Sequence, residues 1–280
     1  MGELRTLLKN ALLKSNVKDD VALFYSGGYE SFTSLIACFD CGIIPTLYTF
    51  YVKGVDSYDL TKARYDADYF ELKLVEVELP NDIESLKRDV YDIIRKTHCA
   101  RKTVVQCMQP IYYTLDKIKE RNVMIGLERG QIWGLNRKGS IAGRKGLEAF
   151  NEYRKKQLED DQFNSTHYIC EEISKKHNLI RLYDDDDVYN WFMSKDYNTL
   201  NYPKPKQIII DEYKDILAQM VCQPKKVNYQ IESGIRELHE SLLQDKQLNP
   251  NNVHKAVVGI YNKILKDIDN AQIQLPLEFD

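Results

Sequence analysis

The sequence lacks several features that would by themselves assign it to a class. It has no run of about eighteen apolar residues, the length that a membrane-spanning helix needs. The amphipathic segment 1–15 has no continuous apolar stretch and no small-residue cleavage site, so we expect no signal peptide. The net charge is only −3, so no basic excess indicates a nucleic-acid partner. These absences favour a cytoplasmic protein that contacts no membrane, and they leave a nucleic-acid partner undecided.

Metal-ligating side chains are also too scattered to form a recognisable site. The six cysteines lie far apart in a chain long enough to fold without disulfides, so we expect reduced thiols. Cys38 and Cys41 form a C-x-x-C with no matching second pair, which favours core cysteines on a helix. The five histidines show no ligand spacing. The acidic run 184–187 lacks the glycine and spaced carboxylates of a calcium loop, so we interpret it as a solvated turn.

Short apolar runs alternate with helical patterns from residue 21 to residue 126. We expect strands at 21–25, 43–52, 73–79 and 123–126, and helices at 30–39, 59–70, 83–97 and 110–120. This alternation predicts an α/β fold with a doubly wound parallel sheet and right-handed crossovers. We assign residues 1–220 to this domain, with a basic, glycine-rich loop at 126–146. Residues 221–280 are expected to form a helical C-terminal extension that packs on the domain or joins two subunits of a homo-oligomer.

A glycine turn follows the first expected strand and opens a helix. Glycine permits a tight turn and close approach to an anion, and free N–H groups at a helix start point at phosphate. Ligands of such sheets bind beyond the carboxyl ends of the strands. We therefore predict a phosphate-binding turn, with a merely tight turn as the alternative. Its residues are Ser26, Gly27, Gly28, Tyr29, Glu30 and Ser31.

This turn resembles the SGGxDS signature of the PP-loop ATP pyrophosphatases, whose fold is adenine nucleotide alpha hydrolase-like. No Gly-Lys-Ser/Thr follows, so it is not a Walker A loop. PP-loop enzymes cleave ATP between the α and β phosphates and adenylate a substrate oxygen. The resemblance therefore implies ATP and Mg²⁺ as cofactors. Glu30 stands where the family has aspartate, and it keeps the charge that holds Mg²⁺.

Within this superfamily, residues 15–220 most resemble the synthetase domain of asparagine synthetases. The stretch 47–50 matches the strand end that holds adenine, which implies that role for Phe50, with a core aromatic as the alternative. The stretch 118–134 matches a helix, strand and loop of the family and places Gly126 at the site. Glu128 is the carboxylate nearest the family's metal-binding position in that loop.

A further resemblance concerns a lysine. The stretch 202–208 resembles the family segment that places a lysine on the ATP phosphates, which implies Lys206 as first choice and Lys204 as second. A positive charge at this position would neutralise the leaving pyrophosphate. The alternative is a solvated lysine at a helix start.

These features predict an ATP-dependent, amidotransferase-like ligase that acts on a small-molecule or nucleotide substrate. It would adenylate a carboxylate or carbonyl oxygen, and ammonia or an amine would displace AMP. Segment 1–20 is too short for the family's glutaminase domain, so the nitrogen donor would come from solution or from a glutaminase partner.

Two alternatives stay open. The first is a PP-loop enzyme of sulfur transfer, sulfonucleotide reduction or nucleobase modification, with Cys99 or Cys107 as a nucleophile. The second is a nucleotide-binding module without catalysis. The basic residues of 136–145 would hold an anionic substrate, with a solvated flexible loop as the alternative, and a nucleic acid would contact the protein there.

Overall fold

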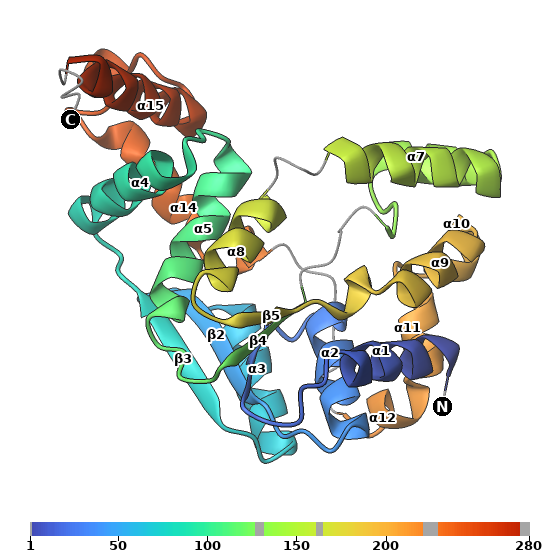
Figure 1. Cartoon of the computed structure of the whole chain (residues 1–280). Helices are drawn as coiled ribbons and strands as arrows, with labels where there is room; N and C mark the ends of the chain where they lie inside the picture. Colours follow the sequence, from blue (N-terminus) through green and yellow to red (C-terminus); the bar gives the residue numbers. More distant parts are fainter. Residues whose placement is uncertain (1, 127–131, 161–164, 221–228, 275–280) are drawn as a thin grey trace, which may run out of the picture. The chain divides into compact units, whose positions relative to one another are not determined.

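A five-stranded sheet organises the chain. The computed structural model describes residues 2–126, 132–160, 165–220 and 229–274 (Figure 1). The strand order is β3-β2-β1-β4-β5, and β1 pairs in parallel with β2 and β4, as β4 does with β5. The chain therefore winds outward from β1 in both directions, which confirms the predicted α/β fold with a doubly wound sheet. The strands are β1 (Val21–Phe24), β2 (Thr46–Val52), β3 (Leu74–Leu79), β4 (Asn122–Ile125) and β5 (Asn178–Ile180).

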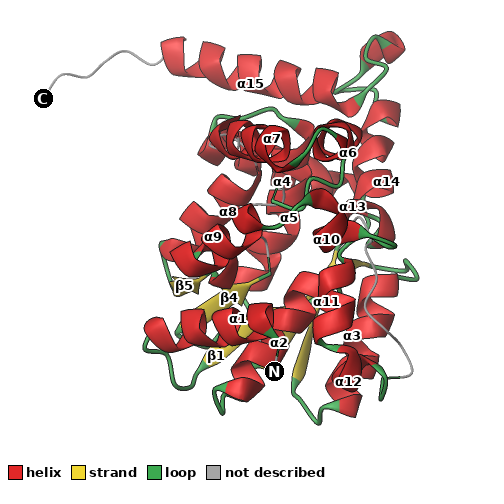
Figure 2. Cartoon of the chain, turned by 90° about the vertical axis from the view of Figure 1, so that its right-hand side faces the viewer, coloured by secondary structure: helices red, strands yellow, loops and turns green. Residues whose placement is uncertain are grey.

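Local chemistry explains where the early elements begin and end. Helix α1 (Glu3–Lys14) buries Leu4, Leu8 and Leu12 and packs against α2 (Tyr29–Asp40), beside which it lies in Figures 1 and 2. Strand β2 begins after Pro45, because a proline nitrogen cannot donate to a ladder. Cys38 is buried in α2, which confirms its core role, and Cys41 is the half-buried C-cap of that helix.

The chain forms two compact units. Unit 1 comprises residues 1–49, 59–76 and 118–227, and unit 2 comprises residues 50–58, 77–117 and 228–280. Strands β2 and β3 begin in unit 1 and end in unit 2. A domain boundary at residue 220 stays a prediction. Among the described residues, none of the helices has the length and apolar character needed to cross a membrane.

Unit 1 contains eight further described helices, of which all but α3 lie in its segment 118–227. They are α3 (Tyr58–Tyr69), α6 (Arg137–Arg144), α7 (Leu147–Asp160), α8 (Ser165–Ser174), α9 (Asp186–Ser194), α10 (Tyr197–Asn201), α11 (Gln207–Glu212) and α12 (Lys214–Leu217), with a 3₁₀ turn at Leu182–Asp184. The acidic run 184–187 begins α9: the Asp185 carboxylate accepts a hydrogen bond from the N–H of Asp187, as an N-cap does.

Two expectations about helices were wrong. Helix α5 spans Lys102–Leu115, so Pro110 lies inside a helix that we expected it to begin. Burial of Val104, Val105 and Met108 against the other helices of unit 2 outweighs the roughly 3 kcal/mol cost of an internal proline. The expected loop at 126–146 contains α6, which Asn136 caps by accepting a hydrogen bond from the N–H of Gly139 at 2.8 Å.

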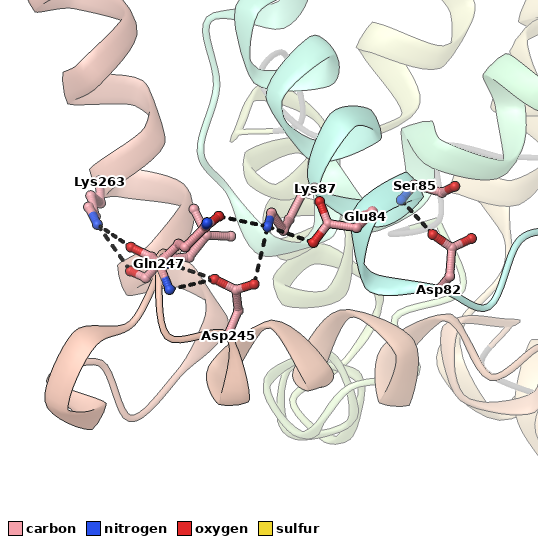
Figure 3. Close-up of polar contacts among 8 residues, drawn as sticks. Asp82, Glu84, Ser85, Lys87, Asp245, Gln247 and Lys263 are labelled. Carbon is pink, nitrogen blue, oxygen red and sulfur yellow. Dashed lines mark hydrogen bonds and ion pairs between the residues drawn. The ribbon is translucent and has the colours of Figure 1, made fainter.

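Unit 2 consists mainly of helices, and a polar cluster around Lys87 links two of them to a turn. Its helices are α4 (Ile83–Thr97), α5, α13 (Tyr229–Glu232), α14 (Ile235–Glu240) and α15 (Val257–Gln274), with 3₁₀ turns at Ser241–Gln244 and Pro250–Asn252. Lys87 Nζ lies 2.9 Å from Glu84 Oε1, 3.3 Å from Asp245 Oδ2 and 3.0 Å from Gln247 Oε1 (Figure 3).

The same cluster fixes the turn at residues 245–248. The backbone N–H groups of Gln247 and Leu248 donate to Asp245 Oδ1, and Lys263 Nζ donates to the carbonyls of the same two residues (Figure 3). Side chains from α4 and α15 therefore hold the break between the 3₁₀ turn at Ser241–Gln244 and α15 in place.

A neutral histidine lies in the core of unit 2. His239 is fully buried, and its Nε2 lies 2.9 Å from Gln109 Oε1, an atom that can only accept. Nε2 therefore carries the proton, and Nδ1 accepts from Tyr261 Oη at 2.6 Å. Gln109 Nε2 in turn donates to Asp89. Burial, with Lys102 nearby, lowers the pKa of His239 to about 3.

This depressed pKa predicts an acid-sensitive stability. The unfolded chain binds a proton at histidine below about pH 6.5, whereas the folded chain does not until about pH 3. The contribution of neutral His239 to the free energy of unfolding is therefore complete above pH 6.5. It falls by up to about 1.4 kcal/mol per pH unit as the pH drops below 6.5. Urea unfolding at a series of pH values should show a flatter dependence for His239→Gln than for the wild type.

Candidate phosphate-binding site

The site begins where β1 passes into α2. Gly27 has a φ of +70°, and Gly28 is the N-cap of α2, whose first turn no side chain caps. Ser31 Oγ donates to Gly28 O at 3.1 Å, and Ser26 Oγ lies 3.5 Å from Ser31 Oγ. Two hydroxyls and the first N–H groups of a twelve-residue helix thus lie together. This is an arrangement suited to an anion.

Glycine is needed at two positions around this turn. A Cβ at Gly126, after β4, would lie 2.8 Å from Ser31 N and 3.0 Å from Ser31 Cα. A Cβ at Gly27 would overlap the side chain of Lys62, in addition to the strain of a positive φ. The end of β4 and the stem of Lys62 therefore pack directly against the backbone of the turn.

A buried ion pair lies beneath the turn. Lys62 and Asp66, one helical turn apart on α3, pair with each other, and both side chains are fully buried. Tyr25 Oη donates to Asp66 Oδ2 at 2.6 Å. Burial raises the pKa of Asp66, and the hydrogen bonds from Lys62 and Tyr25 oppose that rise. We had not predicted this cluster. The i,i+4 spacing of Lys62 and Asp66 was the available signal, but it is also typical of an exposed helix face.

Lys206 meets Glu30 in the same unit. Lys206 Nζ forms an ion pair with Glu30 Oε1 and lies 5.2 Å from the ring centre of Trp133. Only 6% of Lys206 is exposed. Its N–H donates to Asn201 Oδ1 at 3.0 Å, and Asn201 Nδ2 donates to Trp133 O at 2.9 Å. The loop before α11 is thereby tied to the segment around Trp133, and both position the ammonium group beside the turn.

The remaining predicted site residues belong to several parts of the chain. Lys204, two residues before Lys206, is exposed, and Phe50 is half-buried in the part of β2 that belongs to unit 2. Glu128 lies outside the described residues, so its role stays a prediction. Cys99 and Cys107 are buried in unit 2.

The donor set suits a phosphate-bound magnesium ion. Mg²⁺ commonly takes one or two protein carboxylates and completes its shell with water and substrate phosphates. Glu30, 20% exposed at the turn, provides one such carboxylate. Over the described part of the chain, no group of three or more histidine, cysteine or acidic side chains could hold a metal ion. The described histidine, cysteine and acidic residues therefore do not fit a metal centre whose ligands all come from the protein.

Comparison with known proteins gives a limited result. No protein-family model matches the chain, and no curated protein matches it. One similar solved structure is the predicted subunit of tRNA methyltransferase from Methanocaldococcus jannaschii. The identity is 14%, the TM-score is 0.34, and the match covers 71% of this chain and 88% of that one. Another is the U34-tRNA thiolase NcsA from Methanococcus maripaludis with its [4Fe-4S] cluster. The identity is 12%, the TM-score is 0.39, and the match covers 99% of this chain and 80% of that one.

Neither of these two structures is, by name, an asparagine synthetase, so the comparisons give no support to that closer resemblance. At these TM-scores the similarity carries no argument about activity. The chemistry of the site must therefore be argued from the residues themselves.

The turn makes a prediction about stability. Gly27→Ala should lower the free energy of unfolding by more than about 2 kcal/mol, because it adds an overlap with Lys62 to the strain of a positive φ. Gly42→Ala is the matched control: φ there is +73° with open space around the Cβ position, so only the strain of about 1–2 kcal/mol applies. Urea unfolding of both variants measures the difference. Equal losses would show that Lys62 does not pack against Gly27.

Proposed function

We propose that this chain is an ATP-using enzyme of the PP-loop type that splits ATP between its α and β phosphates. The observation that carries the proposal is the ion pair of Lys206 with Glu30 at the uncapped start of α2. It unites, within unit 1, a cation, a carboxylate and an anion-binding turn from segments about 175 residues apart in the sequence.

The proposed roles follow from the charges. The N–H groups of the turn, with the hydroxyls of Ser26 and Ser31, bind phosphate oxygens. Lys206 exchanges its contact with Glu30 for the phosphates of the bound nucleotide, and its charge is needed most on the departing pyrophosphate, whose charge grows as the bond breaks. Glu30 would then be the carboxylate that holds Mg²⁺, which would screen the phosphate charge. A substrate oxygen attacks the α phosphate and takes the adenylyl group.

The acceptor of that adenylyl group distinguishes the hypotheses. An amide-forming ligase stays a proposal without support from the comparisons. Both similar structures are, by name, tRNA-modification proteins, which agrees better with a nucleobase-modifying enzyme, although their low TM-scores make this no argument. Among the described cysteines of unit 1, burial raises the pKa of Cys38 to about 12 and also raises that of Cys170, which does not favour a nucleophilic thiolate there. The predicted nucleophiles Cys99 and Cys107 belong to unit 2, and their role stays a prediction. We take a nucleotide or nucleobase oxygen as the proposed acceptor, with a carboxylate oxygen as the alternative.

The role of Lys206 can be tested by kinetics. Lys206→Ala should reduce turnover by about a hundredfold or more while changing ATP affinity much less, because its charge is needed most as pyrophosphate leaves. Lys204→Ala removes an exposed lysine two residues away and should leave both quantities unchanged. Release of AMP and pyrophosphate from labelled ATP with Mg²⁺ gives turnover, and equilibrium binding gives affinity.

Three outcomes would contradict the proposal in different ways. Equal losses of turnover and affinity in Lys206→Ala would remove its assigned role. ATP that binds but stays intact with every acceptor would favour a nucleotide-binding module. Absence of ATP binding would refute a nucleotide site at the turn.

A further inference from the structure

Helix α6 presents a basic face that the proposed phosphate chemistry does not use. The face comprises Arg137, Lys138, Arg144 and the C-cap Lys145, with Ile141 among them, and every one of these five residues is exposed. At about 100° per residue, they lie within about 120° of the helix circumference. The opposite side carries Gly139 and Gly143. The four cations therefore share one surface rather than a flexible loop.

The two glycines explain why this face points away from the protein. A Cβ at Gly139 would overlap the backbone of Gly134, and a Cβ at Gly143 would overlap the side chain of Tyr197. Helix α6 thus lies with its backbone close to the segment after Trp133 and to α10, with which it makes contacts. Trp133 is the ring beside Lys206 Nζ, so the segment that supports Lys206 also supports α6.

The described part of the chain does not itself neutralise these charges. None of the four basic side chains forms an ion pair with another residue in the described part of the protein. Elsewhere in unit 1, Lys14, Arg64 and Lys175 each pair with a carboxylate. Between residues 136 and 158 the sequence has seven lysines and arginines but two acidic residues, in a chain of net charge −3. Folding alone gives no reason to gather like charges on one helix face.

We propose that this basic face binds the phosphodiester backbone of a single-stranded nucleic acid. Arginine and lysine on a rigid face suit successive phosphates, and each contact adds to a salt-dependent affinity. Exposed apolar side chains beside the cations, Ile141 at 45% and Leu147 at 40%, offer surface to unstacked bases. The further step, that this strand carries the acceptor oxygen, rests on the function proposed above, whereas binding of the strand does not.

The test compares two variants in which the same amount of charge is removed. The first replaces Arg137, Lys138, Arg144 and Lys145 by alanine, which favours helix and so preserves α6. The control replaces four exposed lysines of unit 1 that also make no described ion pair, Lys18, Lys73, Lys119 and Lys214. Labelled RNA and DNA single strands of about twenty nucleotides serve as probes, without ATP, over a range of salt concentrations.

We expect the wild type and the control to bind the strand similarly. The basic-face variant should bind at least about tenfold more weakly, and its slope of log affinity against log salt should be shallower by up to about 0.7 for each phosphate that it no longer neutralises. Comparing the RNA and DNA probes identifies which strand is preferred. Unchanged binding by the basic-face variant, equal losses in both variants, or no binding of either strand at low salt would overturn the proposal. So would binding of phosphatidylserine vesicles without binding of a strand.

The two proposals fail separately. Strand binding without release of AMP and pyrophosphate would refute the enzyme and leave the surface standing. Release of AMP and pyrophosphate without strand binding would refute the surface and leave the enzyme standing. Faster release on addition of the strand to the wild type, but not to the basic-face variant, would support the strand as the acceptor.

Discussion

The packing of Lys62 against Gly27 is the constraint on which the proposed site depends. The stem of Lys62 fills the space where a Cβ at Gly27 would lie, so the backbone turns with a positive φ directly over a buried lysine. Lys62 is held in turn by Asp66, which also receives the hydroxyl of Tyr25 at the end of β1. A buried charge is tolerated when a partner and hydrogen bonds compensate for the lost water. The path from β1 into α2 is therefore fixed from below, and the free N–H groups of α2 are left for a ligand.

The parts that the sequence predicted correctly are those governed by local patterns. Val21–Phe24 is a short apolar run followed by two glycines and a serine-containing helix start, and each of these signals acts over a few residues. The parallel, doubly wound sheet follows from the alternation of such runs with helices. Strand β5 was missed because three residues, Asn178–Ile180, are too few to show a periodicity.

Other parts could not be predicted because tertiary contacts decide them. Lys62 and Asp66 have the spacing of an exposed pair, and nothing local indicates that both are fully buried. The glycines of α6 normally disfavour a helix, yet they permit the close approach to Gly134 and Tyr197 on which α6 depends. Lys206 was proposed from the resemblance of segment 202–208 to a family segment, and its role stays a prediction. Its pairing with Glu30 lies in a loop that Asn201 helps to hold, a contact that no local pattern indicates.

The pairing of Lys206 with Glu30 also gives a physical meaning to the glutamate that stands where the PP-loop signature, which the turn resembles, has aspartate. The longer side chain of Glu30 reaches the ammonium group of Lys206, so neither charge is buried alone. A triphosphate at the turn would be repelled by that carboxylate unless a cation lay between them. The triphosphate would at the same time attract Lys206 away from Glu30, and the carboxylate of Glu30 would then need another positive partner. Binding of the phosphates and binding of a magnesium ion at Glu30 should therefore favour each other, because each supplies the charge that the other requires.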